Sequence, residues 1–296
     1  MKKTLFLVCA LCLGMMFPST ADAKKKKDIA FQMYSVRELI GDPGKFAQNG
    51  DRVLKELADY GYTAIEAANY GDGKLYGLSP EDFKAKVEAA GLKVLSSHTT
   101  RNLDANELNT RDFSNALKWW DECIDAHKRA GFQYIAIPWI SVPKTLKDAQ
   151  TVCDFYNEVG RRGKAAGISI GFHNHTAEFQ KIEGKVFFDY LIENTDPENF
   201  FIQMDVYWAT RAGASPVEYF KKYPKRFRLL HIKDFAEIGQ SGMVGFDAIF
   251  NNSDKAGLEN LVVEMEHATE PDIMAGMKVS ADYLKNAKFV KATYAK

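Results

Sequence analysis

The stretch from Gly171 to Glu178, Gly-Phe-His-Asn-His-Thr-Ala-Glu, places two of the chain's six histidines and a carboxylate within eight residues. It overlaps the end of an apolar run, Ile168 to Phe172, that is typical of a buried strand. Buried titratable groups are costly unless they are paired or ligated, so this crowding favours a metal or acid–base site over a packed core. The alternative is a surface loop that happens to be rich in histidine.

Three more potential ligands stand at the ends of later apolar runs. Asp205 directly follows Phe-Ile-Gln-Met, His231 follows Arg-Leu-Leu, and Glu264 follows Leu-Val-Val. A single carboxylate in such a place can simply cap the next helix. If the three strands are neighbours, however, the side chains converge. Two carboxylates with one imidazole favour Mn²⁺, Mg²⁺ or Co²⁺ over a thiolate-type zinc site.

Strand and helix signals alternate along the chain and predict eight strand–helix units. The expected strands are Ile29–Tyr34, Tyr62–Glu66, Leu92–His98, Tyr134–Pro138, Ile168–His173, Phe200–Met204, Phe227–His231 and Leu261–Glu264. The expected helices are Phe46–Tyr60, Pro80–Ala90, Thr110–Ala130, Leu146–Ala166, Lys185–Glu193, Pro216–Lys222, Phe246–Phe250 and one from Pro271 onward. This pattern predicts an α/β fold, a single-domain (β/α)8 TIM barrel over residues 24–296. A doubly wound open sheet is the alternative, but no glycine-rich phosphate loop follows the first strand.

In such a barrel the chemistry lies at the carboxyl ends of the strands. The residues at these ends are Tyr34, Glu66, His98, Trp139, His173 to Glu178, Asp205, His231 and Glu264. The last three come from neighbouring strands, which weakens the helix-cap interpretation. His127 falls within a helix, where a surface or core role is expected, and His267 lies just past the last strand and could have either role.

Several segments in order along the chain carry a family resemblance. They are Phe31–Arg37, Gly61–Glu66, Phe172–Phe179, Met204–Trp208 with Ala212-Gly213, Leu230–Asp234 and Val263-Glu264. Together they resemble the sugar phosphate isomerase/epimerase superfamily with its xylose isomerase-like barrel. The resemblance implies one divalent metal ion, with Zn²⁺ as a further candidate. Its ligands would be Asp205, His231, Glu264 and a residue from the fifth strand.

The fifth-strand ligand is where the sequence departs from many of these relatives, which place a glutamate on the strand itself. This chain has His173 at that position, and Glu178 follows closely enough to reach the metal. The resemblance therefore favours Glu178 as the ligand, with His173 as the alternative. It leaves His175 as a substrate contact or an acid–base group.

The resemblance also implies chemistry beside a carbonyl group. The metal would stabilise an enediolate of a free sugar or keto-sugar, while Glu178 and Glu264 remove and return the proton, which gives an isomerase or epimerase. Elimination from the same intermediate would give a lyase or hydratase acting on 3-keto-glycosides. A carbohydrate-binding barrel without catalysis is the non-enzyme alternative. The expected substrate contacts are Tyr34, Glu66, His98, His173, Trp208 and Lys233.

The chain begins with the features of a secretory signal peptide over residues 1–23. A basic start, Met1-Lys2-Lys3, precedes an apolar stretch from Leu5 to Phe17, and Ala21-Asp22-Ala23 has the small residues of a cleavage signal. The apolar stretch is shorter than the ~20 residues of a membrane span, so no membrane insertion is expected after cleavage. The prediction is an exported protein, periplasmic or secreted.

Composition narrows the class of partner. Lys and Arg together number 39, and Asp and Glu together also number 39. The chain therefore has no net positive charge that would favour binding to nucleic acid. Export, neutrality and few metal ligands also disfavour DNA repair of the endonuclease IV type. Cys123 and Cys153 fall in expected helices and are expected to be core thiols. Export and the lack of a basic cluster at the rim favour a small unphosphorylated sugar as partner, with homo-oligomerisation left open.

Overall fold

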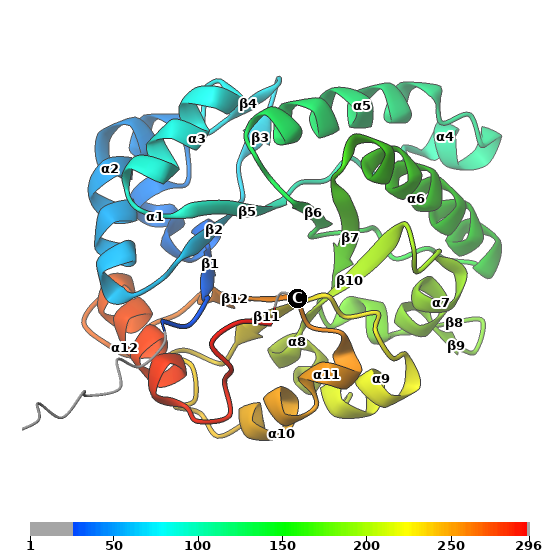
Figure 1. Ribbon diagram of the computed structural model, residues 1–296. Coiled ribbons are helices and arrows are strands. Elements are labelled where there is room, and N and C mark those ends of the chain that lie inside the picture. Colours follow the sequence, from blue (N-terminus) through cyan, green and yellow to red (C-terminus); the bar gives the residue numbers. More distant parts are fainter. Residues whose placement is uncertain (1–25, 295–296) are drawn as a thin grey trace, which may run out of the picture.

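The computed structural model describes residues 26–294 as eight parallel strands closed into a barrel and surrounded by helices (Figure 1). Around the barrel the strands follow the order β1-β12-β11-β10-β7-β6-β5-β2. Their bounds are β1 Ala30–Gln32, β2 Ala64–Ala67, β5 Lys93–His98, β6 Tyr134–Ile137, β7 Ser169–His173, β10 Phe200–Asp205, β11 Leu229–Lys233 and β12 Asn260–Glu264. The predicted (β/α)8 barrel is confirmed. The predicted signal peptide lies outside the described residues.

The helices of the outer layer follow the barrel strands in turn. They are α2 Pro43–Tyr60, α3 Pro80–Ala89, α5 Ser114–Arg129, α6 Leu146–Ala166, α7 Phe187–Asn194, α9 Pro216–Lys222, α10 Phe246–Asn251 and α12 Ile273–Asn286. Side-chain caps start several of them: Asp42 accepts a hydrogen bond from Lys45 N, and Thr145 accepts one from Asp148 N. Gly167 ends α6 in the left-handed region with φ 86°, a conformation that favours glycine. None of the described helices is long and apolar enough to cross a bilayer.

Short helices and two-stranded sheets lie in the loops at both ends of the barrel. They are η1 Met33–Val36, α1 Arg37–Ile40, α4 Ala105–Thr110, η2 Ala177–Phe179, α8 Val206–Arg211, α11 Ser253–Ala256 and the two-stranded sheets β3 Tyr70–Gly71 with β4 Lys74–Leu75 and β8 Lys181–Ile182 with β9 Lys185–Val186. Several of these break up segments that were expected to be regular. The first strand ends at Gln32 and not at Tyr34, because the Gln32 side chain accepts a hydrogen bond from Tyr34 N and starts η1.

Along β1, β2, β10, β11 and β12 the barrel interior changes from apolar to polar within two residues. Its lower layer is a compact apolar cluster of Ala30, Ala64, Leu95, Tyr134, Ala136, Phe201, Leu229 and Val262. Side chains two residues further along a strand point to the same face. The next layer therefore holds the polar residues Gln32, Glu66, Gln203, His231 and Glu264, all buried. The site is thus built directly on the apolar floor.

One glycine is required by this packing. A Cβ atom added at Gly171 would lie 2.6 Å from the ring of Phe201, which fills the interior beside it. Gly171 is therefore the residue of β7 that leaves room for the floor, and His173 two positions later carries the first side chain of the site on this strand. Cys123 and Cys153 are buried free thiols.

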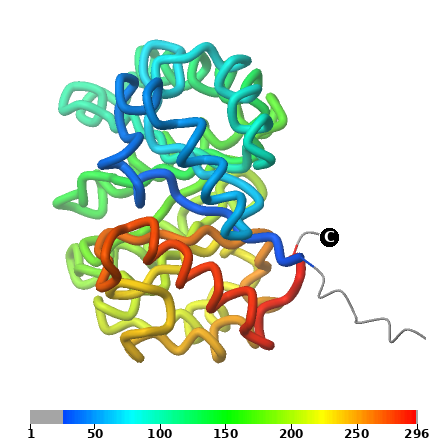
Figure 2. Tube along the Cα trace, turned by 90° about the vertical axis from the view of Figure 1, so that its left-hand side faces the viewer, coloured from blue at the N-terminus to red at the C-terminus, as the bar shows by residue number. Residues whose placement is uncertain are grey.

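Both ends of the described chain lie on the side away from this polar layer. The backbone N–H of Asp28 donates to Ala292 O at 2.8 Å, and Figure 2 shows the blue start and the red end of the chain side by side. Because β1 begins at Ala30, this is the amino end of the barrel strands. The carboxyl ends, and the loops that follow them, form the opposite rim.

Candidate metal centre

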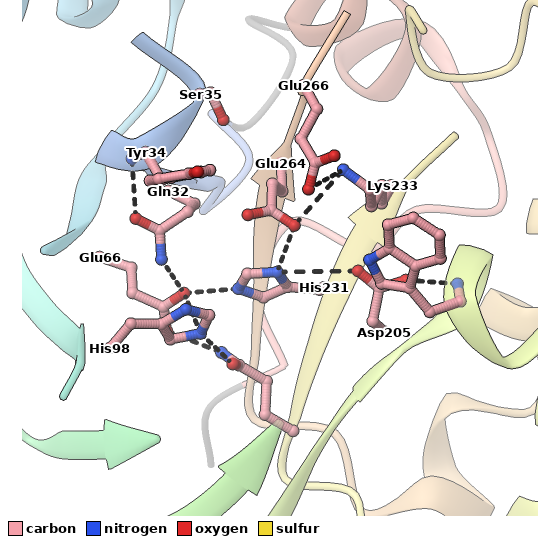
Figure 3. Close-up of polar contacts among 12 residues, drawn as sticks. Gln32, Tyr34, Ser35, Glu66, His98, Asp205, His231, Lys233, Glu264 and Glu266 are labelled. Carbon is pink, nitrogen blue, oxygen red and sulfur yellow. Dashed lines mark hydrogen bonds and ion pairs between the residues drawn. The ribbon is translucent and has the colours of Figure 1, made fainter. Parts of the chain in front are cut away.

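Four side chains from four consecutive barrel strands meet at the carboxyl rim. His173 ends β7, Asp205 ends β10, His231 lies on β11 and Glu264 ends β12. Each offers a nitrogen or carboxylate oxygen, and these atoms all lie within 4.8 Å of one another. All four residues are buried. The expected convergence of Asp205, His231 and Glu264 is what the structure shows (Figure 3).

A fully buried carboxylate, Glu66, lies on the far side of His231. It accepts hydrogen bonds from Gln32 Nε2 at 2.8 Å and from Gln203 Nε2 at 2.7 Å, and His231 Nε2 lies 2.5 Å from its Oε1. His98 Nε2 is 3.1 Å from the same oxygen. Burial raises the pKa of Glu66, but the charges of His98 and His231 outweigh this effect and hold it at about 2. Glu66 therefore remains ionised and accepts the Nε2 proton of His231.

This arrangement fixes which nitrogen of His231 faces Asp205 and Glu264. With Nε2 donating to Glu66, Nδ1 points toward Glu264 Oε2 at 3.5 Å and Asp205 Oδ2 at 4.0 Å. Burial lowers the pKa of His231, but the carboxylates of Glu66 and Glu264 raise it to about 10. Burial raises the pKa of Asp205 to about 7. Two carboxylates aimed at one buried imidazole nitrogen are what a bound cation would balance.

The unsatisfied atoms support a metal at this position. Among the described residues, His173 Nδ1, Asp205 Oδ2 and His231 Nδ1 are buried without a hydrogen-bond partner. Buried polar atoms are normally paired, so three unpaired atoms of ligand type in one group call for a common partner. A cation bound there would take the place of the proton that the neighbouring carboxylates otherwise hold on His231. Asp205 Oδ1 does accept the N–H of Trp208 at 2.8 Å and caps α8. One oxygen of this carboxylate thus caps the helix, and the other is left free for a bound cation.

Glu178 does not join this group. Its side chain is 1 % exposed, and its Oε2 accepts the backbone N–H of His175 at 2.7 Å. Burial raises its pKa. In this structure η2 folds the Glu178 carboxylate back onto its own turn, and His173, the alternative ligand, is the fifth-strand residue that belongs to the group. Glu178 instead fixes the loop that carries His175.

Asn174 is a structural residue of the site that the sequence did not reveal. Its Oδ1 accepts the N–H of Asp205 at 3.1 Å, and its Nδ2 lies 3.3 Å from the Asp205 carbonyl oxygen. This paired contact joins the end of β7 to the end of β10. The amide between two histidines in the sequence motif was the available signal, and it positions Asp205.

A second row of orphaned groups lies beside the metal ligands. Among the described residues, His175 Nδ1, Trp208 Nε1 and Lys233 Nζ are buried without a hydrogen-bond partner. Lys233 Nζ lies 5.6 Å from the centroid of the Trp208 ring, and that ring lies 5.8 Å from the His175 ring. These three residues were expected near the substrate, and the structure brings them together.

The charge on Lys233 is balanced by carboxylates. Its Nζ lies 3.5 Å from Glu264 Oε2 and 3.3 Å from Glu266 Oε1 (Figure 3). Burial lowers the pKa of Lys233, but these carboxylates and Asp205 outweigh it and raise it. Lys233 is therefore a cation with free donor capacity. Glu266 was not anticipated from the sequence, because it lies two residues beyond the end of β12.

The other expected substrate contacts divide by depth. Glu66 was expected to contact the substrate, but in this structure it is fully buried, its oxygens accept from Gln32, Gln203 and His231, and it is a partner of His231. His98 Nε2 donates to Gln203 Oε1 at 2.7 Å, and the His98 ring stacks on His231 with ring centroids 4.9 Å apart. It supports the ligand from behind.

Two rim aromatic residues and two histidines lie outside the metal group. Tyr34 and Trp139 are exposed at the mouth. His127 is a core residue: its Nδ1 lies 2.8 Å from the Cys123 carbonyl oxygen. His267 is exposed just past β12.

A cavity of about 660 Å³ lies at the opposite, amino end of the barrel. Its charged lining is largely internally paired, as in the contact of Arg228 Nε with Glu259 Oε1 at 2.9 Å and of Lys291 Nζ with Asp254 Oδ1 at 2.8 Å. It contains none of the orphaned ligand atoms. The chemistry of the molecule is therefore assigned to the carboxyl rim.

Fold and site together define a (β/α)8 barrel with a buried group of two imidazoles and two carboxylates suited to a divalent cation. The family described as the xylose isomerase-like TIM barrel matches residues 54–287, and the chain belongs to that family.

Similar proteins agree with this assignment. The crystal structure of a sugar phosphate isomerase/epimerase from Parabacteroides distasonis ATCC 8503 superimposes with a TM-score of 0.81 at 32% identity, covering 93% of this chain and 100% of that one. Inosose dehydratase from Geobacillus kaustophilus (strain HTA426) is 24% identical over 206 residues, which span 62% of this chain and 61% of the dehydratase. A crystal structure of the IolI protein with a bound zinc atom shares the fold, with a TM-score of 0.66 at 14% identity over 88% of this chain and 99% of that one.

Proposed function

We propose that this protein is a divalent-metal-dependent isomerase or epimerase that moves a proton beside the carbonyl group of an unphosphorylated sugar. The observation that carries the proposal is the group of His173, Asp205, His231 and Glu264, with three orphaned ligand atoms in a buried, acidic setting. A cation held there would polarise a carbonyl and a neighbouring hydroxyl oxygen of the substrate as a Lewis acid. Mn²⁺, Mg²⁺, Co²⁺ and Zn²⁺ remain the candidates, and the zinc atom in the IolI structure supports a metal in this fold.

Two groups of this chain are suited to handle the proton. Burial raises the pKa of Glu264, but the charges of Lys233 and His231 outweigh it and hold it below its usual range, so its carboxylate stays ionised. Burial lowers the pKa of His175, so its imidazole is neutral at pH 7 and its free Nδ1 can accept a proton. Glu178, expected earlier as the second base, is occupied by its own turn.

The remaining groups would bind and orient the substrate. Trp208 Nε1 is a donor without an acceptor, and the ammonium group of Lys233, which is ion-paired with Glu264 and Glu266, carries three N–H groups, so both side chains can hold a sugar oxygen beside the metal group. Hydrogen-bond donors that are already oriented before the substrate binds stabilise the negative charge that develops on such an oxygen. Glu66 and Gln203 lie behind His231 and keep its Nδ1 directed at the centre.

A lyase or hydratase acting on 3-keto-glycosides is the second candidate. The similarity to an inosose dehydratase supports it, since dehydration also begins with loss of a proton beside a carbonyl group. The same residues would serve, with Lys233 or His175 protonating the leaving oxygen. A carbohydrate-binding barrel without catalysis is the non-enzyme alternative, and it gives no role to the proton-handling groups.

Export of the protein belongs to the proposal as well. The signal-peptide features of residues 1–23 support a location in the periplasm or outside the cell, where free sugars are the more accessible substrates. Cell fractionation with an antibody, and N-terminal sequencing of the exported chain, test this point. A protein retained in the cytoplasm with its first residues intact would contradict it.

A substrate screen in D₂O tests the catalytic proposal. Metal-loaded protein is incubated with free sugars, keto-sugars and 3-keto-glycosides, and products are read by mass spectrometry and NMR. Isomerisation or epimerisation leaves the composition unchanged and carries deuterium into the position beside the carbonyl, whereas elimination changes the mass. Turnover without deuterium uptake at any such position would contradict the proton-transfer route.

The matched control for the screen is Asp205→Asn. The Asn side chain keeps an oxygen that can cap α8, but it lacks the carboxylate charge at the metal centre. Turnover should fall by at least about a hundredfold, as expected for loss of a metal-binding charge. If this variant and protein treated with a chelator were both fully active, the metal-dependent proposal would be wrong.

A further inference from the structure

The large hydrophobic side chains that are strongly exposed all lie at the mouth of the barrel. Among residues 26–294 they are Tyr34, Trp139, Phe235 and Met243, with exposed fractions of 45, 55, 53 and 46 %. Tyr34 follows β1, Trp139 follows β6, and the other two lie in the loop after β11. We call this set the aromatic collar. Its three strands are spread around the closed barrel, so the collar surrounds the entrance to the site.

Such a distribution differs from an ordinary surface. Single exposed hydrophobic residues are normal when they are scattered, but a group that gathers at one entrance marks a place where something binds. Here the outer surface of the helices contributes no member among the described residues. The strongly exposed large hydrophobic side chains of the described residues are therefore concentrated at the rim that carries the polar site.

The collar residues that follow β1 and β11 stand on a fixed backbone. Tyr34 N donates to Gln32 Oε1 at 2.9 Å, and Phe235 N donates to Asp234 Oδ1 at 2.8 Å. Gln32 and Asp234 are both buried, and Asp234 also accepts the N–H of Gly239 at 3.0 Å. The anchors of these two aromatic residues thus belong to the buried polar layer and its margin.

The other two members are held in the same way. The carbonyl oxygen of Trp139 accepts from Thr100 Oγ1 at 3.2 Å and from Asn102 Nδ2 at 3.3 Å, and Met243 N donates to Ser241 Oγ at 3.0 Å. Every collar residue is therefore exposed on an ordered backbone. A surface with this preorganisation loses little conformational entropy when a ligand covers it.

One ring is also fixed by its side chain. The guanidinium of Arg37 lies 4.3 Å from the centroid of the Tyr34 ring, and its Nη1 donates to the Tyr34 carbonyl oxygen at 3.1 Å. This cation–π contact covers one face of Tyr34 and leaves the other face for a ligand. The apolar C–H face of a sugar ring or an apolar aglycone fits such an aromatic face.

We propose that the aromatic collar binds the part of the substrate that lies outside the reacting ring, so that the substrate is a keto-glycoside and not a free monosaccharide. The metal ligands are at most 5 % exposed, whereas the collar is about half exposed. A single ring held at the buried ligands would leave the collar uncovered. An occupant that uses both must extend from the buried site into the mouth. The inference rests on the proposed function for the reacting ring.

A second copy of the chain is the competing occupant. Because the collar residues follow three separated strands of the barrel, a partner chain covering all of them would also cover the rim above the metal group. A ligand that enters the mouth meets the same residues without this conflict. The geometry therefore favours the glycoside.

Binding measurements on the full exported chain, loaded with Mn²⁺, test the proposal without requiring turnover. Glucose, methyl β-glucoside, phenyl β-glucoside and cellobiose serve as probes, with titration calorimetry as the readout. We expect the phenyl glucoside and cellobiose to bind at least about tenfold more tightly than glucose, a difference that well-packed aromatic contacts can supply. Trp139→Ala with Phe235→Ala should bring this ratio close to one.

Variants that keep the rings provide the matched control. Trp139→Phe with Phe235→Tyr should retain the preference, and thermal unfolding should show that both double variants fold. An unchanged ratio in the alanine variant, or no binding of any probe by the parent protein, would overturn the proposal. So would a gel-filtration shift from dimer to monomer in the alanine variant with the ratio unchanged, which would identify the collar as a self-association surface.

The outcome is separable from that of the proposed function. Asp205→Asn should remove turnover in the substrate screen and leave the ratio of glycoside to glucose affinity above one. If turnover on free sugars is found while the ratio is one, the enzyme proposal stands and the collar proposal is wrong. If the ratio is high and no substrate turns over, the reverse holds.

Discussion

At the scale of single residues, the site depends on one hydrogen bond between His231 and a carboxylate outside the four-residue group. Glu66 receives the Nε2 proton of His231 and so directs Nδ1 toward Asp205 and Glu264. Metal-bound histidines are commonly oriented by a carboxylate in this way. The sequence predicted that Glu66 lies at the end of a strand, but it did not predict the depth at which Glu66 is buried. That depth follows from the stagger of β2, where Glu66 lies opposite Gln32 and Ser96.

We expect Glu66→Gln to weaken metal binding by about 10- to 100-fold, the usual cost of losing such a partner. The amide would present a donor where His231, Gln32 and Gln203 all present donors, so the imidazole loses its fixed orientation. Competition with a fluorescent chelator measures the affinity. Glu259→Gln, which alters a carboxylate at the opposite end of the barrel, is the control. Equal metal affinity in Glu66→Gln and the parent protein would show that Glu66 does not position His231.

His173 and Glu178 can be told apart by the same measurement. His173 lies within the four-residue group, whereas Glu178 accepts the His175 N–H. His173→Ala should lower metal affinity by at least about a hundredfold, and Glu178→Gln by less than tenfold, because Gln keeps an acceptor for the turn. A larger loss of metal affinity in Glu178→Gln than in His173→Ala would identify Glu178 as the ligand.

At the scale of elements, the sequence predicted regular segments well and their polar ends less well. Leu146–Ala166 and Pro216–Lys222 are helices with the predicted bounds, because capping residues and glycine mark their ends. The strand predicted as Phe227–His231 is β11 Leu229–Lys233, shifted by two residues. An even shift keeps His231 facing inward and adds Lys233 to the same face. Spacing alone could not decide whether Glu178 would reach the metal, since that depends on how η2 turns.

The packing of α5 against the barrel should make stability depend on pH. Burial lowers the pKa of His127 from 6.5 to about 4, and its Nδ1–H donates to the Cys123 carbonyl oxygen. Above pH 6.5 both states are neutral and this contribution is complete. As the pH falls toward 4, the unfolded chain takes up the proton and the folded chain does not, so stability is lost. The loss between pH 7 and 5 should be about 2 kcal/mol.

Urea unfolding at the two pH values measures this loss. His127→Gln should reduce the difference in unfolding free energy between pH 7 and 5 by most of that amount. The exposed His267→Gln is the matched control and should leave the difference unchanged. A His127→Gln protein with the same pH dependence as the parent would show that other groups set it.

At the scale of the whole molecule, the metal centre joins strands that are distant in sequence. His173 and Glu264 are 91 positions apart, yet β7, β10, β11 and β12 are successive neighbours in the closed barrel. The four ligands come together only when this half of the barrel is closed. Binding of a cation to them therefore stabilises the folded state by mass action, because the unfolded chain has no preformed site.

The protein should consequently melt at a higher temperature when metal is present. At a free metal concentration 100 times Kd the gain is about 2.7 kcal/mol, which corresponds to roughly 5 °C for a domain of this size. Differential scanning calorimetry with Mn²⁺, Co²⁺ and Zn²⁺ measures the shift, and a chelator should reverse it. Asp205→Asn and His173→Ala should melt at the same temperature with and without metal. If these variants kept the full shift of the parent protein, the stabilising ion would be bound elsewhere, and the carboxyl rim would not be the metal centre.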